Sequence, residues 1–205
     1  MSAHHHDHSH IPQNKRILAI SCAIISVYMI VEFLGGHYFR SLTLMADAGH
    51  MANDSLSLLL ALLALYLSER KQRWFALLNG LSLIIVSAYI VYEAIQRWQN
   101  PPVMLALPML AVAVIGLLVN VLVAWLMLKG DHDNLNLKAA YLHVLADMFG
   151  SVVAILAGLS AWLLGWQWVD TVASLILGIF VLKSGWQVTH EAWHELHESE
   201  HHHDH

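Results

Sequence analysis

The chain has 205 residues, of which 58% are hydrophobic and 12% are charged, and its formal net charge is -5 when its 16 histidines are neutral. Soluble domains are about 45–50% apolar and about 25% charged, so this composition excludes an ordinary soluble domain and indicates a polytopic membrane protein. The single cysteine, Cys22, excludes a disulfide framework within the chain and a zinc site built from cysteines.

Residues 1–14 form a polar, histidine-rich tract, in which Asp7 and Ser9 interrupt the histidines. The tract is too polar to bury a core. Because a purification tag is not interrupted in this way, we expect a native tail that collects metal in the cytoplasm.

Six apolar stretches follow, and each is long enough to cross a hydrocarbon core of about 30 Å as a helix. They are Ile17–Phe39, Leu42–Leu67, Trp74–Ile95, Val103–Leu128, Leu137–Leu164 and Val169–Val188. We therefore predict an all-α membrane protein, with a domain of six transmembrane helices over residues 15–190. A second tail rich in histidine and acids is expected over 191–205. His190, His194 and His197 recur at helical spacing, so the last helix is expected to project into the cytoplasm.

Positive charges indicate the orientation, since cytoplasmic segments carry an excess of lysine and arginine. With the N-terminus inside, only Arg40 and Arg97 fall on outer segments. The inner segments hold Lys15, Arg16, Arg70, Lys71, Arg73, Lys129, Lys138 and Lys183. This asymmetry predicts that both termini are cytoplasmic.

Two histidine–aspartate pairs interrupt apolar spans: His50 with Asp54 in the second, and His143 with Asp147 in the fifth. Residues four apart lie on one face of a helix, one turn from each other. An ionisable residue at bilayer depth costs about 2.5–3.5 kcal/mol on insertion scales, so four of them indicate a function. In the expected topology the two spans are antiparallel and both pairs fall near mid-bilayer. Two imidazoles and two carboxylates complete a tetrahedral zinc site, which we predict between these spans.

Three further polar residues lie in the spans. Asp47 is three residues before His50, where it is expected to orient His50 as an acceptor or to line the access path. Glu32 is expected either to relay protons or to pair with a neighbouring helix. Asn120 fits a hydrogen bond between helices better than a place on the path.

The two carboxylates would neutralise a zinc ion, so that the loaded site carries no net charge in the membrane. Metal binding requires the ligands to release their protons, so metal and protons compete for one cage. That competition provides exchange if the site opens alternately to either side. The same ligands accept Zn²⁺, Cd²⁺ and Co²⁺, and the sequence does not rank them.

A resemblance to the cation diffusion facilitator family, particularly its bacterial zinc-efflux branch, covers most of Leu18–Glu198. The residues that carry this resemblance are Glu32–Gly36, Ser41–Asp54, Asn120, Asn136–Ala140 and His143–Asp147. The resemblance implies proton-coupled export of divalent metal across the bacterial inner membrane, usually by a homodimer. It also implies that His50, Asp54, His143 and Asp147 are the transport ligands, and that histidine in the second span favours zinc.

The chain departs from the family pattern in two places. We expect no cytoplasmic metal-binding domain after the sixth span, and we expect Glu69–Arg73 to form only a very short loop. These departures put the way in which a dimer is held together in question.

Two other classes of function remain open. One is a metal sensor, or a partner subunit of a longer transporter. The other is an intramembrane zinc enzyme, which is disfavoured because four protein ligands leave no open coordination position. We therefore expect a transporter and no enzyme. Nucleic-acid binding is not expected either, because no basic stripe is present.

Overall fold

A computed structural model describes residues 10–63, 68–100, 102–129 and 135–201 of the chain. These residues form helices and no strand, which confirms the predicted all-α architecture. The helices are α1 (His10–Phe39), α2 (Leu42–Leu63), α3 (Glu69–Gln99), α4 (Ala106–Met127), α5 (Leu135–Leu164) and α6 (Trp168–His201). The expected ends of α1 and α5 and the expected start of α2 coincide with those observed.

Most other boundaries differ by a few residues, and two of the differences concern the ends of the fold's longer helices. Glu69–Arg73, which we expected as a loop, is the first turn of α3, because the Ser68 carbonyl accepts bonds from the amides of Lys71 and Gln72 at 2.9 and 3.1 Å. The last helix continues well past the expected Val188, to His201.

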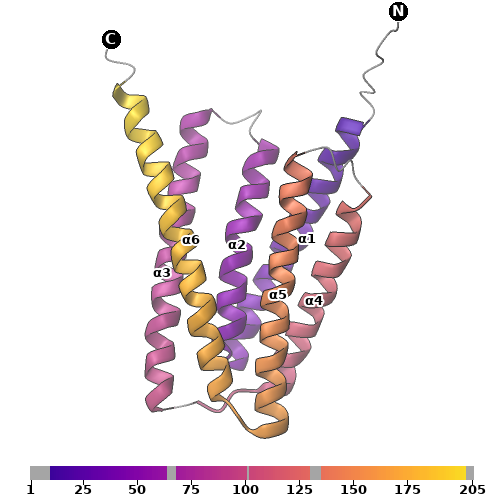
Figure 1. The fold of residues 1–205 in the computed structure, drawn as a ribbon, viewed down its shortest axis with the longest axis vertical. Coiled ribbons are helices and arrows are strands. Elements are labelled where there is room, and N and C mark those ends of the chain that lie inside the picture. Colours follow the sequence, from indigo (N-terminus) through magenta and orange to yellow (C-terminus); the bar gives the residue numbers. More distant parts are fainter. Residues whose placement is uncertain (1–9, 64–67, 101, 130–134, 202–205) are drawn as a thin grey trace, which may run out of the picture.

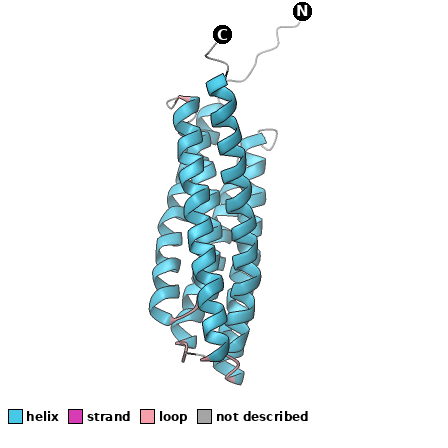
Figure 2. Cartoon of the chain, turned by 90° about the vertical axis from the view of Figure 1, so that its left-hand side faces the viewer, coloured by secondary structure: helices cyan, strands magenta, loops and turns pink. Residues whose placement is uncertain are grey.

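The six helices alternate in direction and form one elongated bundle (Figures 1 and 2). The start of α1 and the end of α6 lie at the same end of the bundle. Helix α2 occupies the centre, where it contacts α1, α3, α5 and α6. The ligands predicted on α2 are therefore surrounded by other helices.

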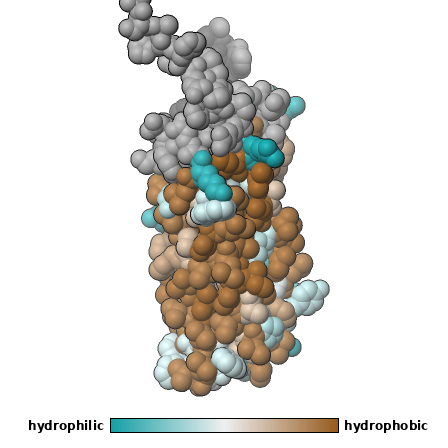
Figure 3. Space-filling model, turned by 90° about the vertical axis from the view of Figure 1, so that its right-hand side faces the viewer, coloured by the Kyte–Doolittle hydropathy of each residue, from teal (hydrophilic) through white to brown (hydrophobic). Residues whose placement is uncertain are grey.

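Five helices contain segments that are long and apolar enough to cross a membrane, judged by length and composition. These segments are Lys15–Phe39, Arg70–Gln99, Ala106–Met127, Tyr141–Leu164 and Trp168–Leu196. Each of these helices carries exposed large hydrophobic side chains, and Figure 3 shows the broad hydrophobic surface on one face of the bundle. Helix α2 is not among them, so the sixth span and the cytoplasmic position of both ends remain predictions.

The connection from α1 to α2 is a tight turn. Arg40 has a φ of 62°, the left-handed conformation that ends many helices, and the Ser41 amide bonds the Gly36 carbonyl at 2.9 Å. The turn delivers the chain directly to the first residue of α2.

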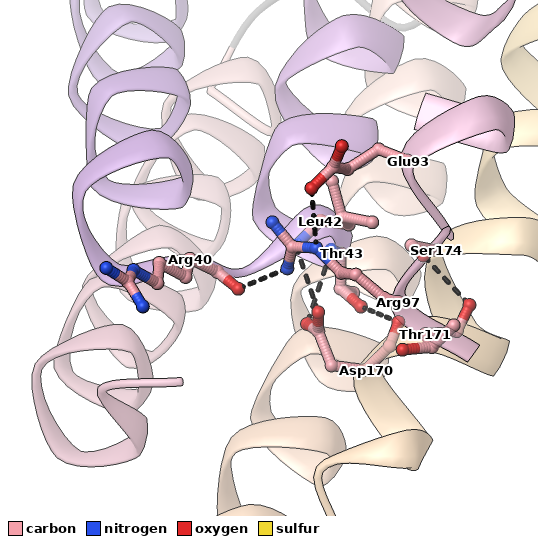
Figure 4. Close-up of polar contacts among 8 residues, drawn as sticks. All are labelled: Arg40, Leu42, Thr43, Glu93, Arg97, Asp170, Thr171 and Ser174. Carbon is pink, nitrogen blue, oxygen red and sulfur yellow. Dashed lines mark hydrogen bonds and ion pairs between the residues drawn. The ribbon is translucent and has the colours of Figure 1, made fainter. Parts of the chain in front are cut away.

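A buried carboxylate from α6 caps the start of α2 (Figure 4). Asp170 accepts hydrogen bonds from the Ser41 hydroxyl at 2.6 Å and from the amides of Leu42 and Thr43 at 2.9 and 3.3 Å. The Thr43 hydroxyl donates in return to the Asp170 carbonyl at 2.9 Å. Because the first amides of a helix have no partner within the helix, this contact fixes where α2 begins.

Candidate metal site

The four predicted ligands come together between α2 and α5, which pack against each other. His50 Nε2 lies 3.9 Å from Asp54 Oδ2 and 3.9 Å from Asp147 Oδ1. His143 Nδ1 lies 3.4 Å from Asp54 Oδ1. Two pairs about 90 residues apart in the sequence therefore share one location.

The two carboxylates are buried, while the two imidazoles are partly open. The side chains of Asp54 and Asp147 are 2% and 1% exposed, whereas those of His50 and His143 are 32% and 46% exposed. Within the described residues, Asp54 Oδ2 and both Asp147 oxygens have no hydrogen-bond partner. Buried carboxylate oxygens without donors are costly, and a bound cation would satisfy them.

Three of the four predicted ligands lie close enough together to hold one small ion. Ligand atoms at about 2.0–2.2 Å from zinc in a tetrahedron lie about 3.3–3.6 Å from one another. Ligand atoms of His50, Asp54 and Asp147 all lie within 4.8 Å of one another, and the closest contact of His143 is 3.4 Å. Side-chain movements of up to about 1 Å would bring His50, Asp54 and Asp147 to these separations, whereas His143 contacts Asp54 from outside this compact group of three.

A second pair of acids lies deeper in the bundle. Glu32 on α1 and Asp47 on α2 are 0% and 1% exposed. Neither oxygen of Asp47 has a hydrogen-bond partner in the described part of the chain, so Asp47 accepts no bond from His50. Asp47 thus does not orient His50 through a hydrogen bond, and the access path remains the other role predicted for it.

A cavity of about 350 Å³ adjoins the cluster between α2, α5 and α6. The cavity is lined mainly by apolar residues. The full lining is Asp47, His50, Ala146, Phe149, Gly150, Leu177 and Phe180. Because Asp47 and His50 both border it, this space reaches the metal-ligand set and the deeper acid pair.

The two asparagines near the site bond between helices. Asn120 Nδ2 donates to the Ser151 hydroxyl at 3.3 Å, which joins α4 to α5. Asn53 Nδ2 donates to the Ser184 hydroxyl at 3.1 Å, and Asn79 Nδ2 donates to Asn53 Oδ1 at 3.1 Å. These bonds link α2 to α3 and α6.

Two supporting residues were missed from the sequence. Asp170 caps α2, and an acid in the first turn of the last span was the available signal. Tyr28 donates to the Val112 carbonyl at 2.7 Å and lies 3.5 Å from Glu32 Oε1. Nothing in the local sequence marks Tyr28, because only the packing of α1 on α4 brings it to Val112.

The bundle defines a multi-pass membrane protein with a cluster of side chains between two of its helices that could hold a metal ion. Comparison of the sequence with known families places residues 18–197 in the cation efflux transmembrane domain family. The chain belongs to this family, as the resemblance implied.

The chain is also similar to named bacterial transporters. It is 46% identical over 206 residues to the cadmium, cobalt and zinc/H(+)-K(+) antiporter of Bacillus velezensis, covering 93% of this chain and 66% of that protein. It is 39% identical over 211 residues to the zinc transporter ZitB of Escherichia coli K12, and the match covers 95% of this chain and 67% of that protein. It is 36% identical over 193 residues to the metal cation efflux system protein CzcD of Cupriavidus metallidurans, and the match covers 88% of this chain and 61% of that protein.

The matched region thus spans about two thirds of the length of these curated relatives. Membership of this family, the apolar helices and the bacterial relatives identify a multi-pass protein of the bacterial inner membrane.

Proposed function

We propose that the chain exports Zn²⁺ from the cytoplasm in exchange for protons. The ion is carried by His50, Asp54, His143 and Asp147. Cd²⁺ and Co²⁺ are the further substrates that this ligand set accepts.

One observation carries the proposal: four ligands from two distant segments converge, and three of their buried carboxylate oxygens lack hydrogen-bond partners among the described residues. Two aspartates balance the charge of one divalent ion. Without metal, protons are the simplest occupants of the same oxygens, so the two cations replace each other. The printed names of the relatives, which include zinc transport and H(+) antiport, support this pairing.

A transporter agrees with these observations better than the other classes. Four ligands leave no open coordination position for an activated water, which disfavours the zinc enzyme. The complete ligand set disfavours an inert partner subunit, and the cation efflux family match disfavours a sensor.

The same proposal includes a homodimer, the usual assembly implied by the family resemblance. It also includes the division of the chain into a cytoplasmic tail over 1–14, a transmembrane domain over 15–190 and a second cytoplasmic tail over 191–205. Residues 1–9 and 202–205 lie outside the described residues, and α6 extends through much of the second tail.

The test is zinc flux and zinc-dependent proton flux in proteoliposomes that contain only the purified chain. His50→Ala is expected to abolish both fluxes, because it removes the imidazole that faces both aspartates. His37→Ala is the matched control: His37 is exposed on α1, away from the cluster, and its removal is expected to leave flux unchanged. Wild-type flux in His50→Ala, with a thermal unfolding midpoint like that of the parent, would refute the proposal.

A further inference from the structure

Helix α6 is longer than a membrane requires. Its 34 residues span about 51 Å at 1.5 Å per residue, against a hydrocarbon core of about 30 Å. His190 and His194 lie about 33 and about 39 Å along the axis from Trp168, the first residue of the helix. Both side chains are exposed, and both lie farther along the axis than the thickness of the hydrocarbon core.

The extension is held in place by α3. Ala192 and Leu196 are buried against Leu77. Arg73 contacts Glu195 twice, with Nε 3.3 Å from Oε2 and Nη1 donating to the backbone carbonyl at 3.0 Å. The helix backbone beneath the two histidines is therefore anchored, and the histidines lie on the face opposite Ala192 and Leu196.

The two imidazoles are arranged to chelate one ion. His190 Nε2 and His194 Nε2 are 3.2 Å apart, with ring centroids separated by 4.3 Å. Two nitrogens bound to one zinc at about 2.05 Å subtend an angle of about 100° at that separation, close to tetrahedral. We propose that His190 and His194 form a second binding site for a divalent transition-metal ion, separate from the intramembrane cluster.

The local sequence supports chelation. His190-Glu191-Ala192-Trp193-His194 has the His-Glu-x-x-His spacing, which puts two imidazoles one turn apart on a helix face. From the sequence we expected this run to extend the last helix and the histidine-rich tails to help collect metal, but we overlooked the His-Glu-x-x-His pattern itself. Glu191 Oε1 accepts a hydrogen bond from Gln187 Nε2 at 3.1 Å, so it is engaged along the helix.

Within the described residues, no third histidine, cysteine or acid joins this pair in a compact group. Water would complete the coordination sphere, and a two-residue site exchanges its ion faster than a closed four-residue site. Such a site is suited to capturing metal and releasing it. Delivery to His50 and Asp54 would rest on the proposed function, but the binding itself does not.

The test is acylation of histidine by diethyl pyrocarbonate, read residue by residue with mass spectrometry on the full chain in detergent. Zn²⁺ is expected to slow the reaction of both His190 and His194 by about tenfold, because a metal-bound nitrogen cannot attack the reagent. Mg²⁺, which prefers oxygen ligands, is expected to have no effect. Exposed His37 reports any general change in reactivity and is expected not to respond.

Variants separate chelation from independent binding. In His194→Ala, protection of His190 is expected to need about a hundredfold more zinc, because the second nitrogen no longer supplies a high local ligand concentration. Glu191→Gln keeps both imidazoles and is expected to retain protection.

Asp54→Asn is expected to retain protection too, which distinguishes failure of the intramembrane site from failure of this one. Absence of zinc protection in the parent chain, or unchanged protection of His190 in His194→Ala, would overturn the proposal. In either case the short distance between the two rings would be a hydrogen bond alone.

Discussion

Removal of the Asp170 carboxylate tests whether the contact between α6 and α2 holds the bundle together. In Asp170→Ala, the Ser41 hydroxyl and the amides of Leu42 and Thr43 lose their acceptor, and these three residues are 0% exposed. Water does not readily replace the acceptor there. The variant therefore leaves three buried donors without a partner.

The size of the effect follows from the three bonds. A hydrogen bond to a charged group contributes about 1.5–3 kcal/mol, and the longest of the three is the weakest. Charge at a helix N-terminus adds about 0.3–2 kcal/mol. Allowing for relaxation, we expect Asp170→Ala to lower the free energy of unfolding by about 3–5 kcal/mol. For a chain of this size, that loss lowers the midpoint of thermal unfolding by about 10 °C.

The assay is thermal unfolding in detergent, followed by the fluorescence of the 8 tryptophans. Asp170→Asn keeps the shape and one oxygen acceptor without the charge, and is expected to lose about half as much. Glu93→Gln is the matched control at the same end of the bundle. It removes an ion pair with Arg97 within α3, which contributes only about 0.3–0.5 kcal/mol. A midpoint for Asp170→Ala within about 2 °C of the parent would refute the reasoning.

Two further substitutions probe the surroundings of the ligand cluster. Gly150→Ala would place a methyl group against the carboxylate of Asp47. The required displacement is expected to lower the free energy of unfolding by about 1–3 kcal/mol in the same assay. An unchanged midpoint would show that Asp47 moves freely. Asn53→Ala removes the side chain that joins Asn79 to Ser184. It is expected to lower the free energy of unfolding by about 1–2 kcal/mol, while zinc flux in proteoliposomes persists. Abolished flux in a folded variant would assign Asn53 to transport.

Helix positions were predictable because a membrane restricts the backbone. In hydrocarbon every amide and carbonyl needs a partner within its own segment, so an apolar stretch of about 20 residues forms a helix. The same regularity predicted that His50 and Asp54 share a face, as do His143 and Asp147. Glu69–Arg73 was predicted wrongly, because its charged residues suggested a loop, whereas Ser68 begins a helix there and Arg73 contacts α6.

The sequence by itself determined which segments are helical, that the chain is a membrane protein, and which side chains are paired on one helix face. The two His–Asp pairs also predicted that α2 and α5 meet. Only the tertiary structure decided their register, which sets His143 3.4 Å from Asp54, and the contact of α6 with the start of α2 through Asp170. The physical reason lies in the surfaces of the helices. Their outer faces are as apolar as their inner ones, so hydrophobic periodicity does not reveal the packing. The helices are instead ordered by close packing and a few buried polar contacts between residues far apart in the chain.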